Sequence, residues 1–226
     1  MSEAIIDYGS GNLRSAEKAV ERSMDEQGLN QPVIVTSCPV EVSKAARIIL
    51  PGVGAFGDCI DGLRALDGMV DCLNQAVLKD GKPFLGICVG MQLLATEGHE
   101  HGNHAGLGWI KGTVDQLVIP EGQDLNIPHI GQKLKIPHMG WNQLNVAEGY
   151  ESHPIVDGIK DGDHVYFVHS YQFNCDDDKH IMAQTEYGHN FPAIIGRDNI
   201  VGTQFHPEKS QRVGLQLLGN FLKWSP

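Results

Sequence analysis

Short apolar runs alternate with longer amphipathic stretches through the first half of the chain, and this alternation constrains the fold more than any other feature. The apolar runs lie at residues 4–6, 32–36, 47–50 and 83–87. Between them, residues 13–27 and 58–79 carry apolar side chains at helical spacing, with a break expected near Gly68. Strands that alternate with helices in this way predict an α/β fold, in which helices flank a central, mostly parallel sheet.

The second half of the chain has a different pattern, because its apolar runs are shorter and are separated by Gly, Pro, Asn and Asp. Candidate strands lie at residues 112–119, 134–137, 164–168, 181–186 and 193–195, and a final helix is expected at 213–224. Such runs predict added antiparallel strands that extend the central sheet and form a smaller side sheet. No repeat or low-complexity linker divides the chain, so we predict a single domain over residues 1–226.

Charge and hydropathy exclude several kinds of partner. The 226 residues include 17 Lys and Arg against 28 Asp and Glu, which gives a formal net charge of −11. We expect binding neither to nucleic acid nor to an anionic membrane surface, since both are recognised through basic patches. No apolar run reaches the roughly 18 residues of a membrane-spanning helix. No basic segment precedes the first apolar run, so the N-terminus does not resemble a signal peptide.

The five cysteines are odd in number and include no Cys-x-x-Cys pair, which argues against a disulfide framework or a zinc site. Free thiols favour a cytoplasmic location. Residues 98–104 contain several acid and base side chains, and we interpret them as a solvated loop. We therefore expect no metal site.

The most informative motif is Gly-Ile-Cys-Val-Gly at residues 86–90, which joins an apolar run to a predicted helix. It matches the Gly-x-nucleophile-x-Gly elbow of hydrolases, with Cys88 in the place of serine. Glycines allow the sharp turn, and the N-terminus of the following helix favours a thiolate. We predict that Cys88 is a nucleophile and that the amide of Val89 helps to bind an oxyanion. The alternative is a buried cysteine in an ordinary strand–helix turn.

A second constellation, Gly-Thr-Gln-Phe-His-Pro-Glu at residues 202–208, lies where an apolar strand is expected to end at His206. A thiol nucleophile needs a base to accept its proton, and the base needs an acid that orients its ring. His206 and Glu208 supply both from one short segment. The alternative is a surface histidine followed by an acidic residue at the start of the last helix.

The loop Gly-Val-Gly-Ala-Phe-Gly at residues 52–57 can be interpreted in two ways. Its glycine spacing matches a dinucleotide-binding fingerprint, although it follows the third predicted strand rather than the first. It also suits a loop whose backbone N–H groups bind an oxyanion. We prefer the second interpretation, because residues about twenty positions on lie in a helical stretch and not at the end of a following strand.

Together these motifs resemble those of the triad (class I) glutamine amidotransferases, which implies a flavodoxin-like α/β domain. The segments that carry the resemblance lie at residues 7–15, 50–57, 86–94, 136–142, 166–171 and 202–210. Within the family they are most similar to the glutaminase subunits of imidazole glycerol phosphate synthases. That resemblance implies hydrolysis of glutamine to glutamate and ammonia in histidine biosynthesis, with no cofactor. It also implies a heterodimer with a cyclase subunit of (βα)8-barrel fold, which receives the ammonia through a channel.

The resemblance also implies roles for individual residues. Cys88, His206 and Glu208 would form the catalytic triad, and the amides of Val53 and Val89 would bind the oxyanion. The residues implied to hold glutamine are Gly52, Gly54, Gln92, Glu100, Ser170 and Tyr171. The residues implied to face the cyclase or to gate the channel are His138, Trp141, Tyr166 and Lys209.

Some assignments stay open at this point. Glu97 competes with Glu100 for the contact with glutamine, and residues 121–131 are interpreted as a surface insertion without a motif. Another class I amidotransferase, such as the glutaminase of pyridoxal phosphate synthase, would share the triad but not the segment at residues 136–142. A nucleotide-binding flavodoxin-like module would use the glycine loop instead. An α/β-hydrolase would place the acid before the histidine, whereas here His206 precedes Glu208.

Overall fold

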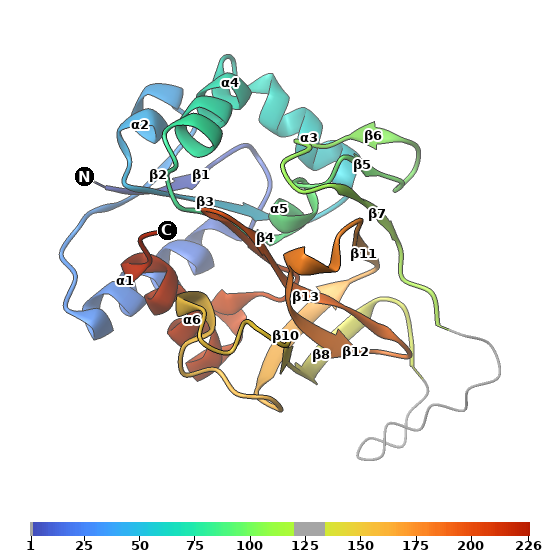
Figure 1. Ribbon diagram of the computed structural model, residues 1–226. Helices are drawn as coiled ribbons and strands as arrows, with labels where there is room; N and C mark the ends of the chain where they lie inside the picture. Colours follow the sequence, from blue (N-terminus) through green and yellow to red (C-terminus); the bar gives the residue numbers. More distant parts are fainter. Residues whose placement is uncertain (1, 120–133) are drawn as a thin grey trace.

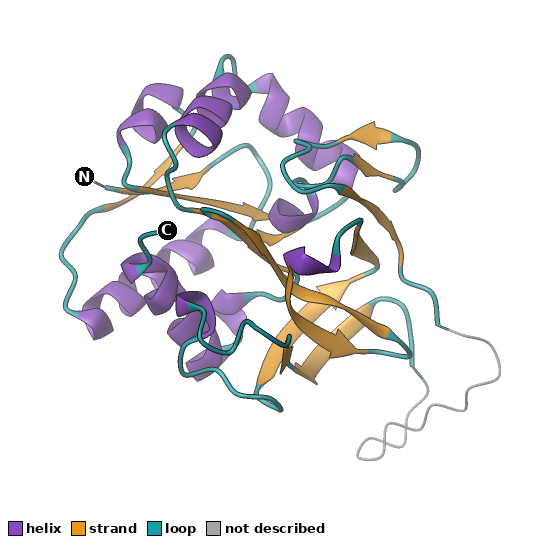
Figure 2. Ribbon diagram, viewed as in Figure 1, coloured by secondary structure: helices purple, strands orange, loops and turns teal. Residues whose placement is uncertain are grey.

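The computed structural model describes residues 2–119 and 134–226, so the stretch predicted as an insertion at 121–131 lies outside the described residues. An eight-stranded sheet runs through the molecule, with helices on both of its faces (Figures 1 and 2). In spatial order its strands are β2 (Val33–Thr36), β1 (Glu3–Ile6), β3 (Arg47–Gly52), β4 (Phe84–Cys88), β14 (Ile200–Thr203), β13 (Asn190–Arg197), β12 (Ile181–Glu186) and β9 (Asn145–Val146).

The sheet is parallel in one half and antiparallel in the other. The pairs from β2 through β1, β3 and β4 to β14 are all parallel. The pairs from β14 through β13 and β12 to β9 are antiparallel. The strands β3 and β4 are almost entirely buried, which explains why they are continuous apolar runs rather than alternating ones. The predicted parallel core with added antiparallel strands is therefore confirmed.

The helices cover the sheet in two groups (Figure 1). They are α1 (Leu13–Gln27), α2 (Pro39–Lys44), α3 (Phe56–Ala65), α4 (Met69–Leu73), α5 (Val89–Gln92) and α6 (Gln211–Lys223). α1 packs against α6 on one face, and α2, α3 and α4 lie over the other. Gly68, in a left-handed conformation, breaks the predicted long helix between α3 and α4, and a π-helical turn at Asn74–Lys79 continues α4. Single 3-10 turns lie at Pro154–Val156, Asp178–His180 and Pro207–Lys209.

Two smaller sheets complete the fold where one side sheet was predicted. One is a hairpin of β8 (His138–Gln143) and β10 (His164–His169). The other contains β11 (Tyr171–Cys175), β7 (Gly112–Gln116), β5 (Glu97–Gly98) and β6 (His104–Ala105). The strand predicted at 134–137 was wrong, because β8 begins only at His138, after a proline that has no N–H to donate to a strand partner.

The carboxyl ends of three neighbouring strands meet at one edge of the central sheet. In the register of β3 and β4, Gly52 lies opposite Cys88, and on the other side of β4 Thr203 of β14 pairs with Ile87. The chain beyond β14 is tied to β10 by a hydrogen bond from the N–H of His206 to the carbonyl oxygen of Tyr166, 3.0 Å long. Ligand sites in open α/β sheets lie at such strand ends. Within the described residues, no helix is both long and apolar enough to cross a membrane.

Candidate active site

Cys88 occupies a strained turn between β4 and α5. Its φ is 55° and its ψ is −111°, which a residue with a side chain rarely adopts. A Cβ on Gly86 would lie 2.5 Å from the carbonyl oxygen of Gly90, and a Cβ on Gly90 would lie 1.8 Å from that of Leu50. The glycines of the motif are therefore required by the close approach of α5 to β3 and β4, as an elbow demands.

His206 and Glu208 form a buried pair just beyond β14. Nδ1 of the imidazole lies 2.8 Å from Oε1 of the carboxylate, and both side chains are almost fully buried. Nε2 of His206 is also buried and forms no hydrogen bond with residues 2–119 or 134–226. Burial disfavours the charged imidazole, but the neighbouring Cys88 and Glu208 outweigh it and raise the pKa of His206 to about 10. The pair is therefore arranged to hold a proton beside Cys88.

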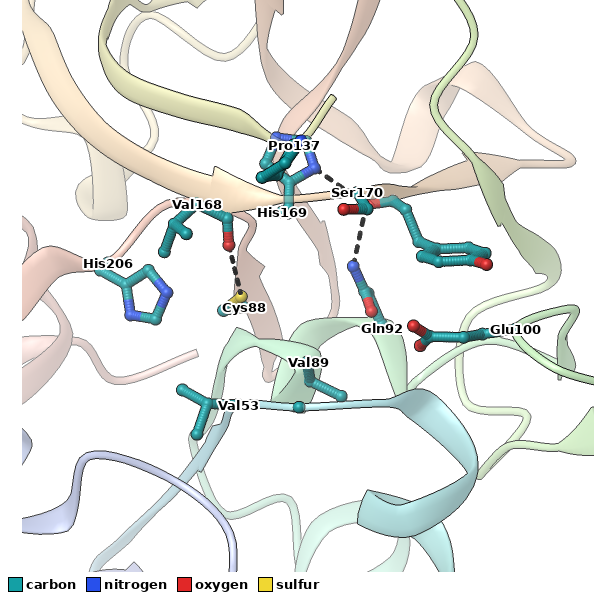
Figure 3. Close-up of a pocket in the computed structure, with 12 residues that line it drawn as sticks. Val53, Cys88, Val89, Gln92, Glu100, Pro137, Val168, His169, Ser170 and His206 are labelled. Atoms are coloured by element: carbon teal, nitrogen blue, oxygen red, sulfur yellow. Dashed lines mark hydrogen bonds between the residues drawn. The ribbon is translucent and has the colours of Figure 1, made fainter. Parts of the chain in front are cut away.

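A pocket of about 300 Å³ brings most of the predicted residues together (Figure 3). His206 lies beside Cys88 at one end, and Glu100 lies toward the other. The lining residues are Val53, Gly54, Cys88, Val89, Gln92, Glu100, Pro137, Val168, His169, Ser170, Tyr171 and His206. Glu208 lies behind His206 and does not line the pocket. Neither do Gly52 and Glu97, so of the two competing glutamates only Glu100 reaches this space.

A row of amide groups leads from the wall of the pocket to the sulfur. Nε2 of Gln92 donates to the carbonyl oxygen of Tyr171 and to Oε1 of Gln204, both at 3.0 Å. Nε2 of Gln204 then donates to Sγ of Cys88 at 3.7 Å. Sequence reasoning missed Gln204, which lies just beyond β14 and two residues before His206.

Comparison with known proteins identifies the family of this chain. The family model for class I glutamine amidotransferases matches residues 4–224. The chain belongs to the class I glutamine amidotransferases. A curated relative from Rhodospirillum rubrum, "Imidazole glycerol phosphate synthase subunit HisH", is 53% identical over 226 residues and is matched over 100% of both chains. The protein of the same name from Brucella suis is 52% identical over 229 residues, also over 100% of both.

Solved structures share the fold at much lower identity. A glutamine amidotransferase from Thermotoga maritima superposes with a TM-score of 0.66 at 14% identity, over 99% of this chain and 96% of the other. The glutaminase domain of CTPS from Trypanosoma brucei, solved with bound acivicin, gives 0.62 at 14% identity, over 100% and 96%. The predicted amidotransferase fold is confirmed, and the chain is an enzyme of this class.

In this amidotransferase, the two peptide groups on either side of Val53, in the loop after β3, are both hydrogen-bonded to side chains. The N–H of Val53 donates to Oγ of Ser10 at 3.3 Å, and the Ser10 hydroxyl donates back to the carbonyl oxygen of the same residue. Sγ of Cys59 donates to that carbonyl at 3.4 Å. Burial raises the pKa of Cys59, which keeps the thiol protonated as a donor. An oxyanion role for Val53 stays a prediction. It requires the peptide between Gly52 and Val53, which carries this N–H, to turn.

The same loop argues against the dinucleotide interpretation. Oε2 of Glu100 accepts a hydrogen bond of 2.7 Å from the N–H of Phe56, the first residue of α3. A dinucleotide fingerprint needs this helix N-terminus for a pyrophosphate. Here a protein carboxylate occupies that position, so a second anion at the same place would be repelled.

The residues predicted to face a partner protein divide into two groups. Trp141 is 42% exposed and packs edge-on against Tyr166, and Nζ of Lys209 lies 5.8 Å from the centre of the Tyr166 ring. His138, in contrast, is 1% exposed, so it adds nothing to this exposed surface, and its interface or gate role stays a prediction. Side chains alternate across a strand, and β8 places Trp141 and His138 on opposite faces because they are three residues apart.

His138 instead belongs to the buried wall behind the pocket. Its Nδ1 lies 3.0 Å from Nε2 of His169, whose Nδ1 is 2.9 Å from the carbonyl oxygen of Tyr171. The ring also stacks on Tyr187 with the ring centres 4.0 Å apart. Burial, reinforced by the neighbouring His169, lowers the pKa of His138 to about 3. Burial lowers the pKa of His169 to about 4, so both rings are neutral near pH 7.

Proposed function

We propose that this chain is the glutaminase subunit of an imidazole glycerol phosphate synthase. It hydrolyses glutamine to glutamate and ammonia, and the ammonia passes to a (βα)8-barrel cyclase subunit with which it forms a heterodimer. There the ammonia reacts with a phosphoribulosyl-formimino ribonucleotide of histidine biosynthesis. The products are imidazole glycerol phosphate and an aminoimidazole carboxamide ribonucleotide. The observation that carries this proposal is the similarity at 53% identity, over the full length of both chains, to a protein of that name.

Cys88, His206 and Glu208 are the proposed catalytic residues. The Cys88 thiolate attacks the side-chain carbonyl carbon of glutamine, so a C–S bond forms and the oxygen becomes an oxyanion. His206 gives its proton to the amide nitrogen, the C–N bond breaks, and ammonia leaves a thioester. The same ring takes a proton from water, whose oxygen bonds to the thioester carbon; the C–S bond then breaks, so glutamate leaves and the thiolate and the protonated ring are restored. Glu208, 2.8 Å from the ring, stabilises the imidazolium throughout.

The remaining pocket residues are proposed to orient the substrate and its transition state. The N–H groups of Val89 and, after its peptide turns, Val53 would bind the oxyanion. The amino-acid end of glutamine would be held by Gln92, Glu100, Ser170 and Tyr171 with the loop from Gly52 to Gly54. This proposal is supported by the pocket, which gathers these residues, except Gly52, around Cys88. Side chains and backbone supply every proton transfer and charge contact in the scheme, so it needs no cofactor.

The cyclase is proposed to bind the surface that includes Trp141, Tyr166 and Lys209. Exposed Met139, on the same face of β8 as Trp141, adds apolar area to this surface. Exposed aromatic and apolar groups beside a cation are typical of protein–protein interfaces. We propose that one domain spanning residues 1–226 carries this activity and that the enzyme works in the cytoplasm, where free thiols stay reduced.

A Cys88→Ala variant in complex with the cyclase tests the proposal. Glutamine should no longer support ring formation, because no thioester can form. Ammonium salt at high pH should restore it, because free ammonia bypasses the mutated site. The assay follows consumption of the ribonucleotide substrate by absorbance, with either nitrogen source.

Size-exclusion chromatography of the variant complex provides the control for assembly. A wild-type complex that labels at Cys88 with a diazo-ketone analogue of glutamine, and at none of the other four cysteines, would support the nucleophile. An assembled variant that fails with both nitrogen sources would contradict the division of labour. Full glutamine-dependent activity of the variant would contradict the role of Cys88.

A further inference from the structure

A row of three hydrogen bonds joins Tyr171 to Cys88 through Gln92 and Gln204. The carbonyl oxygen of Tyr171, at the start of the row, fixes which atom donates in each bond. A backbone carbonyl oxygen can only accept, so the atom of Gln92 that faces Tyr171 must be the amide nitrogen. The same nitrogen faces Gln204, whose facing atom must therefore be the amide oxygen. This leaves the nitrogen of Gln204 toward Sγ of Cys88, at 3.7 Å. The row therefore ends in an N–H donor at the sulfur.

Burial and backbone anchoring hold this row in place. Gln204 is 0% exposed and Gln92 is 3% exposed, so water does not compete for their amide groups. The backbone N–H of Gln204 donates to the carbonyl oxygen of Ala193 on β13 at 2.9 Å. Rotating the Gln204 amide by half a turn would place its nitrogen against the nitrogen of Gln92, so that one N–H of each amide would face a donor instead of an acceptor. Unsatisfied buried donors cost about 1–3 kcal/mol each, which disfavours the reversed orientation.

We propose that Gln204 is a further catalytic residue of the glutaminase reaction, whose amide N–H, oriented by Gln92, stabilises the Cys88 thiolate. This inference rests on the proposed function of Cys88 as the nucleophile. The two protonation states of the sulfur have separate partners. The thiol can donate to the carbonyl oxygen of Val168, 3.9 Å away, and the thiolate accepts from Gln204. A proton that moves from Cys88 to His206 therefore leaves a charge that already has a donor beside it.

Gln204 does not line the pocket, so it contacts the nucleophile but not the bound substrate. Its loss should lower kcat for glutamine while KM changes little. A residue that only shaped the pocket would have the opposite effect. Replacement by methionine removes the donor while keeping the length of the side chain. Replacement by glutamate keeps the bond from Gln92 but turns a carboxylate oxygen toward the sulfur.

The test is alkylation of Cys88 by iodoacetamide in the full chain, followed by mass spectrometry of the Cys88 peptide from pH 5 to pH 10. The thiolate displaces iodide and forms a thioether, so the rate reports how much thiolate is present. Hydrogen bonds to charged groups typically contribute 1.5–3 kcal/mol, so Gln204→Met should slow alkylation on the rising limb about 10- to 100-fold. Gln204→Glu should slow it more. Both differences should shrink at the highest pH, where the thiol is ionised without help.

The other titratable groups around Cys88 are the same in every variant of this series, so a displaced pH profile is attributable to Gln204. They are Tyr8 after β1, Cys59 on α3, Glu100 after β5, His169 on β10, Tyr171 on β11, and the pair His206 and Glu208 after β14. Gln216→Met, on the outer helix α6, is the matched control and should leave the profile unchanged, because this amide bonds only to Asn220 within the described residues.

Each outcome decides the proposal. Equal rates in wild type and both Gln204 variants would overturn it, and so would a loss that is the same at every pH, since that indicates altered packing. If Gln204→Met does not fold, Gln204→Glu, which keeps the size and the bond from Gln92, decides alone. A wild type whose Cys88 reacts no faster than Cys38 or Cys175 would instead contradict the nucleophile itself, and with it the proposed function.

Discussion

Two glycine-bordered segments meet at the rim of the pocket and are held in place in different ways. The elbow at Cys88 is 3% exposed, and backbone contacts that only glycine permits fix its position between β3 and β4. The loop at Val53 directly follows Gly52, the residue that pairs with Cys88; Val53 is 40% exposed and is held by the side chains of Ser10 and Cys59. One segment is fixed by steric packing, and the other by hydrogen bonds that can exchange.

This difference separates a permanent part of the site from an adjustable one. Moving the elbow would require β3, β4 and α5 to separate. Turning the Val53 peptide requires only the exchange of individual hydrogen bonds, each worth about 1 kcal/mol. Gly54, with a φ of 101° and open space around its Cα, gives the loop room to turn. We therefore expect that the nucleophile is always ready and that the partner protein controls the oxyanion donor, so the isolated chain should be a poor glutaminase.

Two alanine substitutions should show the largest contrast between these segments. In Gly90→Ala the new Cβ would lie 1.8 Å from the Leu50 carbonyl oxygen, so the elbow cannot keep its place. We expect a loss of at least about 1000-fold in glutaminase activity and of about 3 kcal/mol in the free energy of unfolding. Gly54→Ala meets no atom within 4 Å and should cost only about 1 kcal/mol, from its positive φ.

Chemical denaturation and steady-state kinetics of both variants, with saturating cyclase, measure the contrast. A Gly90→Ala protein with unchanged stability would show that the elbow is not fixed by packing. A Gly54→Ala protein that is as unstable as Gly90→Ala would remove the distinction between the two segments.

The permanent part of the site should also show an order of importance among its members. His206→Ala should lower activity by at least about 1000-fold, because the ring transfers protons in every step. The Glu208→Ala variant should keep about 10- to 100-fold more activity than His206→Ala, because Glu208 acts only through the ring. Initial rates with saturating cyclase decide this, after circular dichroism has shown that both variants are folded. A folded Glu208 variant that is the more damaged of the two would reverse the roles.

The buried histidines behind the pocket should make the stability of the protein sensitive to acid. His138 and His169 have pKa values lowered to about 3 and about 4, whereas the unfolded chain takes up protons near pH 6.5. Between these limits the unfolded state binds more protons, so stability falls as the pH decreases below 6.5. Each histidine should account for about 2 kcal/mol of the free energy of unfolding lost between pH 7.5 and pH 5.

Urea denaturation of His138→Asn at both pH values measures this effect, and the variant should lose about 2 kcal/mol less than wild type. The matched control is His164→Asn, which replaces an exposed histidine on the neighbouring strand β10 and should lose as much as wild type. If His138→Asn and wild type are equally acid-sensitive, the buried pair is not the cause.

The parts of the molecule that were predictable depend on local pattern. Apolar β-branched runs indicated β2 and β3, and the spacing of glycines around Cys88 indicated the elbow, because backbone sterics leave few alternatives there. The separation of two residues between His206 and Glu208 was enough to bring ring and carboxylate together. In each case the sequence signal lies within a few residues, even where a contact that it implies, such as that of Gly90 with Leu50, is distant in the chain.

The parts that were missed depend on partners far away in the chain. Gln204 became visible only when Gln92 and Tyr171 supplied the direction of its amide. The direction of the Val53 N–H depends on Ser10, 43 residues away. The burial of His138 could have been predicted, since an exposed Trp141 on the same strand requires the opposite face for it. Alternation along a strand was a usable signal, whereas hydrogen-bond direction was not.

The smallest expected effect concerns the adjustable segment. In Ser10→Ala the Val53 N–H loses its acceptor, while Cys59 still holds the carbonyl oxygen of the same residue. The N–H of Val53 then gains a hydrogen bond by turning toward the pocket, where a developing oxyanion would be its acceptor. One hydrogen bond of about 1 kcal/mol corresponds to a rise of about 5- to 10-fold in glutaminase activity of the isolated chain. The rate with saturating cyclase should change little, because the bond to Ser10 would already be broken there. Ser43→Ala removes a comparable hydroxyl-to-carbonyl bond at α2, away from the pocket, and should leave both rates unchanged. If Ser10→Ala instead lowered the basal rate, the Ser10 hydroxyl would be supporting the active form of the loop, and the two segments would be equally fixed.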